Sequence, residues 1–200
     1  MTHETPFGEQ SLWRIGENIP WVVPWSEENE FGLRSSPIFE GLVEFTQSER
    51  QGSGRPLPSG MNVMRQRRGV LEFRCHVCGE ATPAGDRYLF PVVTGTFLKL
   101  PGGTRYASHL PPTHAECAER AQRLCPHLRS RYAQPVAFPN DKGFVTPERS
   151  VPESLRPIAA QFRTPNPPVY GYYRVFGEGF TRLVRRLRRS EPPADDRQGL

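Results

Sequence analysis

The sequence has no long hydrophobic run and very little lysine. None of its 200 residues belongs to a stretch of about 18 consecutive apolar residues, so we expect no transmembrane helix. Of its 26 basic residues, only Lys99 and Lys142 are lysines. Such an arginine bias is typical of a GC-rich genome. The formal net charge of +5 is therefore weak support for nucleic-acid binding.

Cysteine is also scarce, and the four cysteines do not indicate a disulfide framework. The sequence opens with no secretory signal pattern, so we expect a cytoplasmic location where thiols stay reduced. A lone cysteine is most often a small buried hydrophobe. Two of the four, however, form the pair Cys75-His76-Val77-Cys78, which Gly79 follows. This spacing brings two sulfurs to one ion, and the glycine allows the backbone to turn sharply after the second.

A His-x-x-Cys pair, His114 and Cys117, follows after 35 intervening residues. Two prolines end the preceding strand, Thr113 is a favourable N-cap, and Glu116 completes a capping-box pattern. The pattern predicts a helix over 114–124 with the pair on one face of its first turn. Zinc prefers four tetrahedral sulfur and nitrogen ligands. The predicted ligands of one structural Zn²⁺ ion are therefore Cys75, Cys78, His114 and Cys117.

Two further residues, Cys125 and His127, are alternative ligands. Cys125 lies eight residues after Cys117, about 80° around the helix, and we expect it to pack at the helix end. It stays an alternative to His114 as the fourth ligand. Four protein ligands leave no position for water, which disfavours a catalytic zinc. His114-Ala115-Glu116 also matches the His-x-Glu of zinc deaminases, but no Pro-Cys-x-x-Cys pair follows it, so we reject that chemistry.

The predicted fold class is α+β, a small irregular domain built on this zinc site. The order of knuckle, β-hairpin and helix resembles treble-clef zinc modules. Residues 88–100 and 104–109 are rich in β-branched and aromatic residues, and they flank a Pro101-Gly102-Gly103 turn. With 22 prolines and 18 glycines in the chain, we expect a modest core and much irregular loop.

We expect four segments along the chain. Residues 1–60 form an irregular N-terminal segment whose tryptophans pack on the core. Residues 61–130 form the treble-clef-like zinc module, opened by a short helix within 61–74. Residues 131–189 are loop-rich and end in a strand at 169–176 and a basic amphipathic helix at 180–189. Residues 190–200 form a disordered tail.

Two arginine clusters are candidate nucleic-acid surfaces, one before the knuckle and one on the C-terminal helix. The commoner role of such a run is a solvated helix face, and both interpretations stay open. The candidate residues are Arg65, Arg67, Arg68, Arg182, Arg185, Arg186 and Arg189.

Four short segments carry a family resemblance. They resemble a group of uncharacterised proteins from actinobacteria and their phages, over about residues 55 to 185. The resemblance implies a cytoplasmic zinc-module protein of mobile-element origin, and it implies no activity. The segments are Arg65-Gln66-Arg67-Arg68, Cys75-x-x-Cys78-Gly79, His114-x-x-Cys117-Ala118 and Cys125-Pro126-His127-Leu128.

The favoured function is a non-catalytic structural-zinc protein that binds nucleic acid, DNA or RNA, or a protein partner. One alternative is a metal-dependent nuclease of the HNH type, which would use His109 and His127. The sequence offers it no Asp-His or Asn-x-His pattern, and Asn140 is isolated. The other alternative is a structural or regulatory partner in a phage or host complex.

Overall fold

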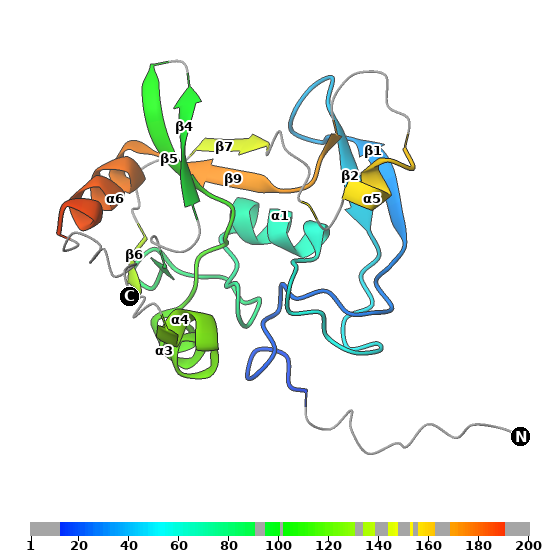
Figure 1. The fold of residues 1–200 in the computed structure, drawn as a ribbon, viewed down its shortest axis with the longest axis horizontal. Coiled ribbons are helices and arrows are strands. Elements are labelled where there is room, and N and C mark those ends of the chain that lie inside the picture. The colour runs from blue at the N-terminus through cyan, green and yellow to red at the C-terminus, as the bar shows by residue number, and fades with distance from the viewer. Residues whose placement is uncertain are drawn as a thin grey trace, which may run out of the picture.

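The computed structural model describes residues 13–90, 95–100, 102–130, 134–138, 144–147, 153, 156–162 and 169–190. Over these ranges the chain is a mixed α+β fold with nine short strands and five helices (Figure 1). The predicted α+β class is confirmed, whereas the finer treble-clef description stays a prediction. None of the helices in this part of the chain has the length and apolar character needed to cross a membrane.

The largest sheet is antiparallel and has four strands in the order β4-β5-β9-β7. Its strands are β4 (Gly95–Leu100), β5 (Gly103–Ser108), β9 (Tyr173–Phe176) and β7 (Phe144–Pro147). Leu100 pairs with Gly103 across a tight hairpin turn, which confirms the predicted turn. Gly102 and Gly103 both have positive φ, at 85° and 121°, and such turns need glycine for this reason.

A second sheet pairs two distant parts of the chain. It contains β1 (Phe31–Ser35), β2 (Val43–Gln47) and β8 (Val169–Tyr170), with β2 antiparallel to β1 and parallel to β8. The N-terminal segment is therefore less irregular than predicted. The predicted strand 169–176 is divided at Gly171, because β8 joins this sheet and β9 joins the other.

The remaining elements of the described chain are a short strand pair and five helices. Strands β3 (Tyr88–Leu89) and β6 (Val136–Ala137) form a separate short pair. The helices are α1 (Val63–Glu72), α3 (Ala115–Leu124), α4 (Pro126–Ser130), α5 (Arg156–Ala159) and α6 (Glu178–Ser190). The predicted tail lies, after Ser190, outside the described residues.

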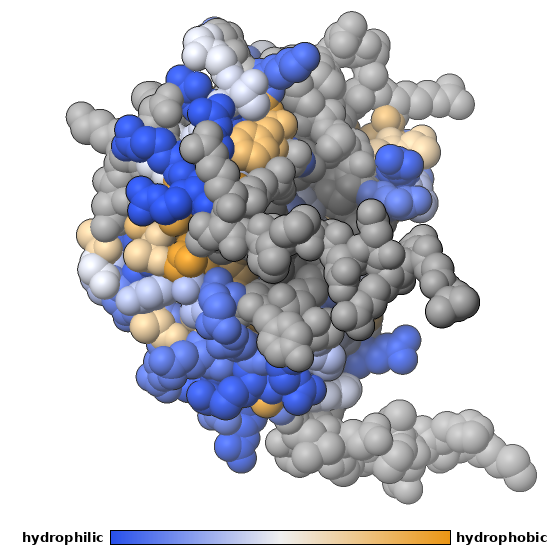
Figure 2. All heavy atoms as spheres, turned by 60° about the vertical axis from the view of Figure 1, so that its left-hand side comes forward, coloured by the Kyte–Doolittle hydropathy of each residue, from blue (hydrophilic) through white to orange (hydrophobic). Residues whose placement is uncertain are grey.

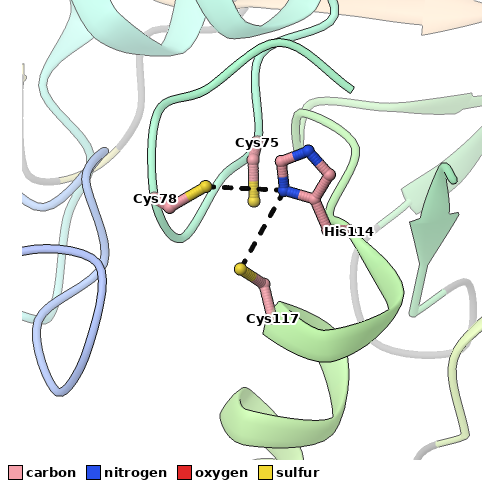
Figure 3. A group of neighbouring side chains, drawn as sticks. All are labelled: Cys75, Cys78, His114 and Cys117. Atoms are coloured by element: carbon pink, nitrogen blue, oxygen red, sulfur yellow. Dashed lines mark hydrogen bonds between the residues drawn. The ribbon is translucent and has the colours of Figure 1, made fainter. Parts of the chain in front are cut away.

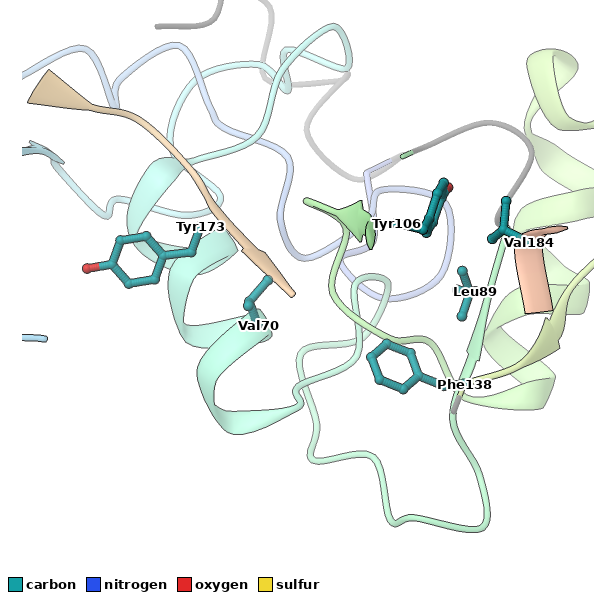
Figure 4. Packing of buried hydrophobic residues seen from close by; sticks show 6 residues of the cluster. All are labelled: Val70, Leu89, Tyr106, Phe138, Tyr173 and Val184. Carbon is teal, nitrogen blue, oxygen red and sulfur yellow. The ribbon is translucent and has the colours of Figure 1, made fainter. Parts of the chain in front are cut away.

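Helix α1 lies at the centre of the fold (Figure 1). Asn62 caps it by accepting hydrogen bonds from the backbone N–H groups of Met64 and Arg65. Its two apolar ends enter different clusters: Val63 packs with Phe45 and Tyr172, and Val70 enters the main core. Figure 4 shows that main core, which contains Val70, Leu89, Tyr106, Phe138, Tyr173 and Val184.

Three consecutive polar residues of α1, Arg65 to Arg67, are also inside the fold. Arg65 is 1% exposed, and its two terminal nitrogens each donate to one oxygen of Glu28 at 2.6 Å. Gln66 donates to the carbonyls of His109 at 2.6 Å and Tyr173 at 2.8 Å, and it accepts from the N–H of Tyr173 at 3.0 Å. The hydrogen bonds of Arg65 to Glu28 therefore cross the predicted segment boundary at residue 60. Those of Gln66 to Tyr173 cross the predicted boundary at residue 130.

Arg67 completes this internal polar network. It is 3% exposed, pairs with Glu44 at 3.3 Å, and donates to the backbone carbonyls of Phe45 and, at 2.7 Å, Gly171. Burial lowers the pKa of Arg67, and Glu44 opposes that shift by stabilising the charged form. The prediction that Arg65 and Arg67 belong to a nucleic-acid surface is therefore wrong, because both guanidinium groups are buried and paired with carboxylates inside the fold.

Replacing Glu28 with alanine tests the buried ion pair. We expect Glu28→Ala to lower the free energy of unfolding by about 3–5 kcal/mol, because it leaves the Arg65 charge buried and unpaired. The measurement is urea denaturation followed by circular dichroism.

Glu30→Ala is the matched control, because Glu30 also pairs with an arginine, Arg50, but both side chains are more than half exposed. That change should cost about 1 kcal/mol or less. Equal losses in Glu28→Ala and Glu30→Ala would contradict the assigned role of the buried pair.

Candidate metal centre

The Cys-x-x-Cys segment forms a closed loop directly after α1. The N–H of Cys75 donates to the carbonyl of Glu80 at 2.7 Å, and the N–H of Gly79 donates to the carbonyl of Cys75 at 2.9 Å. The Val77 N–H points at the Cys75 sulfur at 3.4 Å, where it would stabilise a thiolate. These local hydrogen bonds hold the first two sulfurs close together, and the hydrogen bond from the His76 N–H to the Pro112 carbonyl at 2.8 Å ties the loop to a distant segment.

Gly79 is required in this loop for two reasons. Its φ is +82°, which side-chain-bearing residues rarely adopt. A Cβ at this position would also lie 2.7–2.8 Å from three ring atoms of Trp21. The Trp21 ring thus covers the loop, and the backbone N–H of Trp21 donates to the carbonyl of Val77 at 2.7 Å. The N-terminal segment is in this way part of the wall of the candidate site.

Helix α3 supplies the second pair, but not through the predicted cap. The helix begins at Ala115, and His114 is its N-cap residue with extended backbone and no capping hydrogen bond of its own. Thr113 is paired with Tyr88 in an isolated antiparallel bridge, which uses both the backbone N–H and the carbonyl of Thr113. The predicted capping box is therefore wrong. Instead, the carboxylate of Asp86 accepts from the Ala115 N–H at 2.7 Å.

Sequence reasoning missed the contribution of Asp86. This residue lies 29 positions before Ala115, within a turn, and no local pattern connects the two. A carboxylate at a helix N-terminus satisfies an unpaired N–H and is favoured by the helix dipole. Asp86 thereby holds the end of α3 that carries the candidate ligands.

The four predicted ligands come together in one group (Figure 3). Their ligand atoms all lie within 4.8 Å of one another. The Nδ1 atom of His114 is 3.4 Å from the sulfur of Cys78 and 4.0 Å from that of Cys117. Ligands bound tetrahedrally at Zn–S and Zn–N distances lie roughly 3.6–3.8 Å apart, so the group has the dimensions of a metal site. The group could hold a metal ion.

The imidazole of His114 is oriented as a metal ligand would be. Its Nε2 atom lies 3.1 Å from the carbonyl oxygen of Ala81. A carbonyl can only accept, so Nε2 carries the proton and Nδ1 presents its lone pair toward the sulfurs. Metal-bound histidines commonly have this second hydrogen bond, which fixes both the tautomer and the ring orientation.

The electrostatics of the group favour a cation. Burial raises the pKa of the Cys117 thiol, and the nearby sulfurs of Cys75 and Cys78 raise it further. Burial also raises the pKa of Cys78, while a backbone N–H from Glu80 acts in the opposite direction. Three thiolates at this distance repel one another, so a bound cation is what would keep them deprotonated together.

The alternative ligands lie elsewhere. Cys125 is the C-cap residue of α3 and stands outside the group, as does His127. His109 stacks on the ring of Tyr172, with 6.1 Å between centroids. Over the described ranges, the Cys75–Cys117 group is the one cluster of three or more potential ligands within bonding reach of one ion. Asn140, considered for a nuclease site, lies outside those ranges.

One of the remaining candidate arginines lies on α1, and the others lie on α6. Arg68 is half exposed, pairs with Glu49, and stands over the ring of Trp21. Arg182, Arg185 and Arg186 are exposed on α6. The side chain of the last candidate, Arg189, is not among those that the structure describes.

Comparison of the chain with protein-family models, with curated proteins and with solved structures gave no match. The resemblance to actinobacterial and phage proteins therefore stays a prediction. Function has to be argued from the site itself.

Changing Gly79 to alanine tests the geometry of the Cys-x-x-Cys loop. We expect Gly79→Ala to lower the free energy of unfolding by at least about 1–3 kcal/mol, because it combines a left-handed backbone with a clash against Trp21. Thermal and urea denaturation would measure the loss.

Gly85→Ala is the control, because a Cβ at Gly85 meets no atom within 4 Å and its φ is not positive. That variant should keep the wild-type stability. If Gly79→Ala were as stable as Gly85→Ala, the loop would not need the observed geometry.

Proposed function

We propose that the Cys75, Cys78, His114 and Cys117 group holds one Zn²⁺ ion, and that this ion has a structural role. The observation that carries the proposal is the convergence of three sulfurs and one correctly oriented imidazole nitrogen within 4.8 Å. Thiolate and imidazole are the ligands zinc prefers at tetrahedral sites. Mg²⁺ and Ca²⁺ prefer oxygen ligands, so the donor set argues against them.

The group is better suited to stabilising the fold than to catalysis. Four protein ligands fill a tetrahedral site and leave no position for water or substrate. Cys75 is completely buried and Cys117 is 7% exposed. A zinc ion here would join the loop after α1 to helix α3. Structural sites of this kind have apparent binding free energies of about 10–16 kcal/mol, which is comparable to the net stability of a whole domain.

The zinc proposal is tested by a matched pair of cysteine variants, Cys117→Ser and Cys125→Ser. Both change one sulfur to oxygen, and the two positions are eight residues apart. Native mass spectrometry should find one zinc per wild-type chain and one per Cys125→Ser chain. Cys117→Ser should lose the ion and most of its stability. Zinc retained in Cys117→Ser, or lost in Cys125→Ser, would refute the assigned ligand set.

We further propose that the exposed arginines of α6 bind the phosphate backbone of a nucleic acid. Supporting this, α6 packs on β5 through the buried Val184, and the hydroxyl of Thr181 accepts from the N–H of Tyr106 at 2.9 Å. Arg185 donates to the carbonyl of Thr104 at 3.4 Å. The helix is thus held in place while Arg182, Arg185 and Arg186 are exposed, and fixed cations on one face suit phosphate contacts.

The neighbouring β-hairpin extends the same positive surface. Lys99 is exposed on β4 and Arg105 is half-buried on β5, and neither strand contains an acidic residue. Figure 2 turns this side of the molecule forward and shows hydrophilic side chains gathered on it. We name this surface, made by Lys99, Arg105, Arg182, Arg185 and Arg186, the α6 basic face. Phosphate contacts carry no sequence information, so a surface of this kind favours binding without strong sequence preference.

Removing two cations from the α6 basic face tests the nucleic-acid proposal. The double variant Arg182→Ala/Arg186→Ala should bind a 20-nucleotide DNA more weakly than wild type at low salt. The slope of log affinity against log salt should fall by about 2, or slightly less for single strands, because two phosphate contacts are lost. Fluorescence anisotropy at several salt concentrations would measure both quantities.

The control for this experiment is Arg14→Ala/Arg50→Ala, which removes the same charge from two exposed, ion-paired arginines outside that face. It should leave the slope unchanged. Wild-type protein with no salt-dependent affinity for DNA or RNA would end the nucleic-acid proposal without affecting the zinc proposal.

A further inference from the structure

A cavity of about 560 Å³ lies beside the candidate metal centre. Its walls come from six parts of the chain: residues 17–23, residues 58–61, the loop residues His76 and Val77, residues 109–110, the C-terminal end of α3 with Pro126, and Tyr172. A volume of this size lies within the ~300–1,000 Å³ typical of small-molecule sites. A smaller cavity of about 210 Å³ adjoins it and shares His76, Val77 and Cys125.

The walls of the larger cavity are mainly apolar. Val22 is fully buried, and Val23, Met61 and Leu110 add further aliphatic surface. Among its described lining residues, Glu17 is the one with a formal charge at neutral pH when histidine is neutral, and its carboxylate pairs with Arg14 at 3.3 Å. A charged ligand would lose its hydration here without gaining a compensating partner, so the walls favour an uncharged one.

One polar group in these walls lacks a partner. The Nδ1 atom of His76 is buried and has no hydrogen-bond partner within the described structure. A neutral imidazole offers one N–H donor and one acceptor. Buried polar atoms are almost always satisfied, so the imidazole that His76 contributes to the cavity lining is a polar group with an unmet hydrogen bond.

We infer that this cavity binds a small, uncharged and largely apolar molecule with one hydroxyl or similar polar group, which hydrogen bonds to His76. The apolar walls supply most of the affinity, and the imidazole sets the orientation. Such a division of roles is common in small-molecule sites. The inference is independent of the nucleic-acid proposal, because the cavity and the α6 basic face share no residue.

Three probes of one shape test the inference on the full-length protein. They are naphthalene, 1-naphthol and 1-naphthoate, titrated at pH 7.5 and followed by ligand-observed NMR. We expect 1-naphthol to bind about three- to tenfold more tightly than naphthalene, which is the range that one hydrogen bond supplies. The charged 1-naphthoate should bind most weakly. Failure of all three to bind at millimolar concentration, or tightest binding of the anion, would overturn the inference.

A pair of leucine variants locates the binding. Leu124 lines the cavity and is 53% exposed, so Leu124→Trp should fold while its larger ring occupies the mouth. Its affinity for 1-naphthol should fall at least tenfold. Leu71, on α1, is 40% exposed and does not line the cavity, so Leu71→Trp should bind like wild type. Equal affinities in the two variants would mean that the probes bind elsewhere.

His76→Phe separates the hydrogen bond from the apolar contribution. Phenylalanine keeps the ring shape and removes both nitrogens, so naphthalene should still bind. The three- to tenfold preference for 1-naphthol should disappear. Near-ultraviolet circular dichroism and zinc content would verify that the variant is folded. A preference that survived in folded His76→Phe would show that His76 does not bind the hydroxyl, and it would overturn the inference.

Discussion

Arg65 donates from both terminal nitrogens to the carboxylate of Glu28, and this ion pair is buried inside the protein. The rest of the fold is arranged around it. Arg65 and its two neighbours on α1 point about 100° apart around the helix axis. Each nevertheless finds internal partners: Arg65 in the N-terminal segment, Gln66 at β9, and Arg67 at β2. A helix with buried polar groups in three directions has to be enclosed over most of its circumference, which explains why α1 is central although Arg68 and Leu71 are partly exposed.

This arrangement also explains how a chain with only 36% hydrophobic residues forms an interior. The apolar clusters on either side of α1 are small, and polar side chains complete the space between them. Buried charges give little net stability, but an unmatched one costs a great deal. We therefore expect the network to favour one packing, because another arrangement would leave a guanidinium or a carboxylate unpaired. The Cys75–Cys117 group adds a second constraint at one end of α1.

The sequence predicted those features that depend on short spacings. The Cys-x-x-Cys and His-x-x-Cys pairs, the helices near 63–72 and 115–124 and the Gly-Gly turn all follow from patterns within a few residues. Features that depend on distant partners were missed. Arg65 was predicted to lie on the surface because its partner, Glu28, lies 37 residues away in the sequence. Thr113 was predicted to cap a helix because its partner, Tyr88, is also distant in the sequence.

The same distances give the chain an order of events during its synthesis. At about 5–20 residues per second, the ligands His114 and Cys117 emerge several seconds before the last strands do. The carbonyl that receives Arg67 is that of Gly171, which is made 104 residues later, on the order of 5–20 seconds after the arginine. A growing chain can therefore bring the Cys75–Cys117 group together first, while Gln66 and Arg67 still lack the partners that residues 171–173 supply.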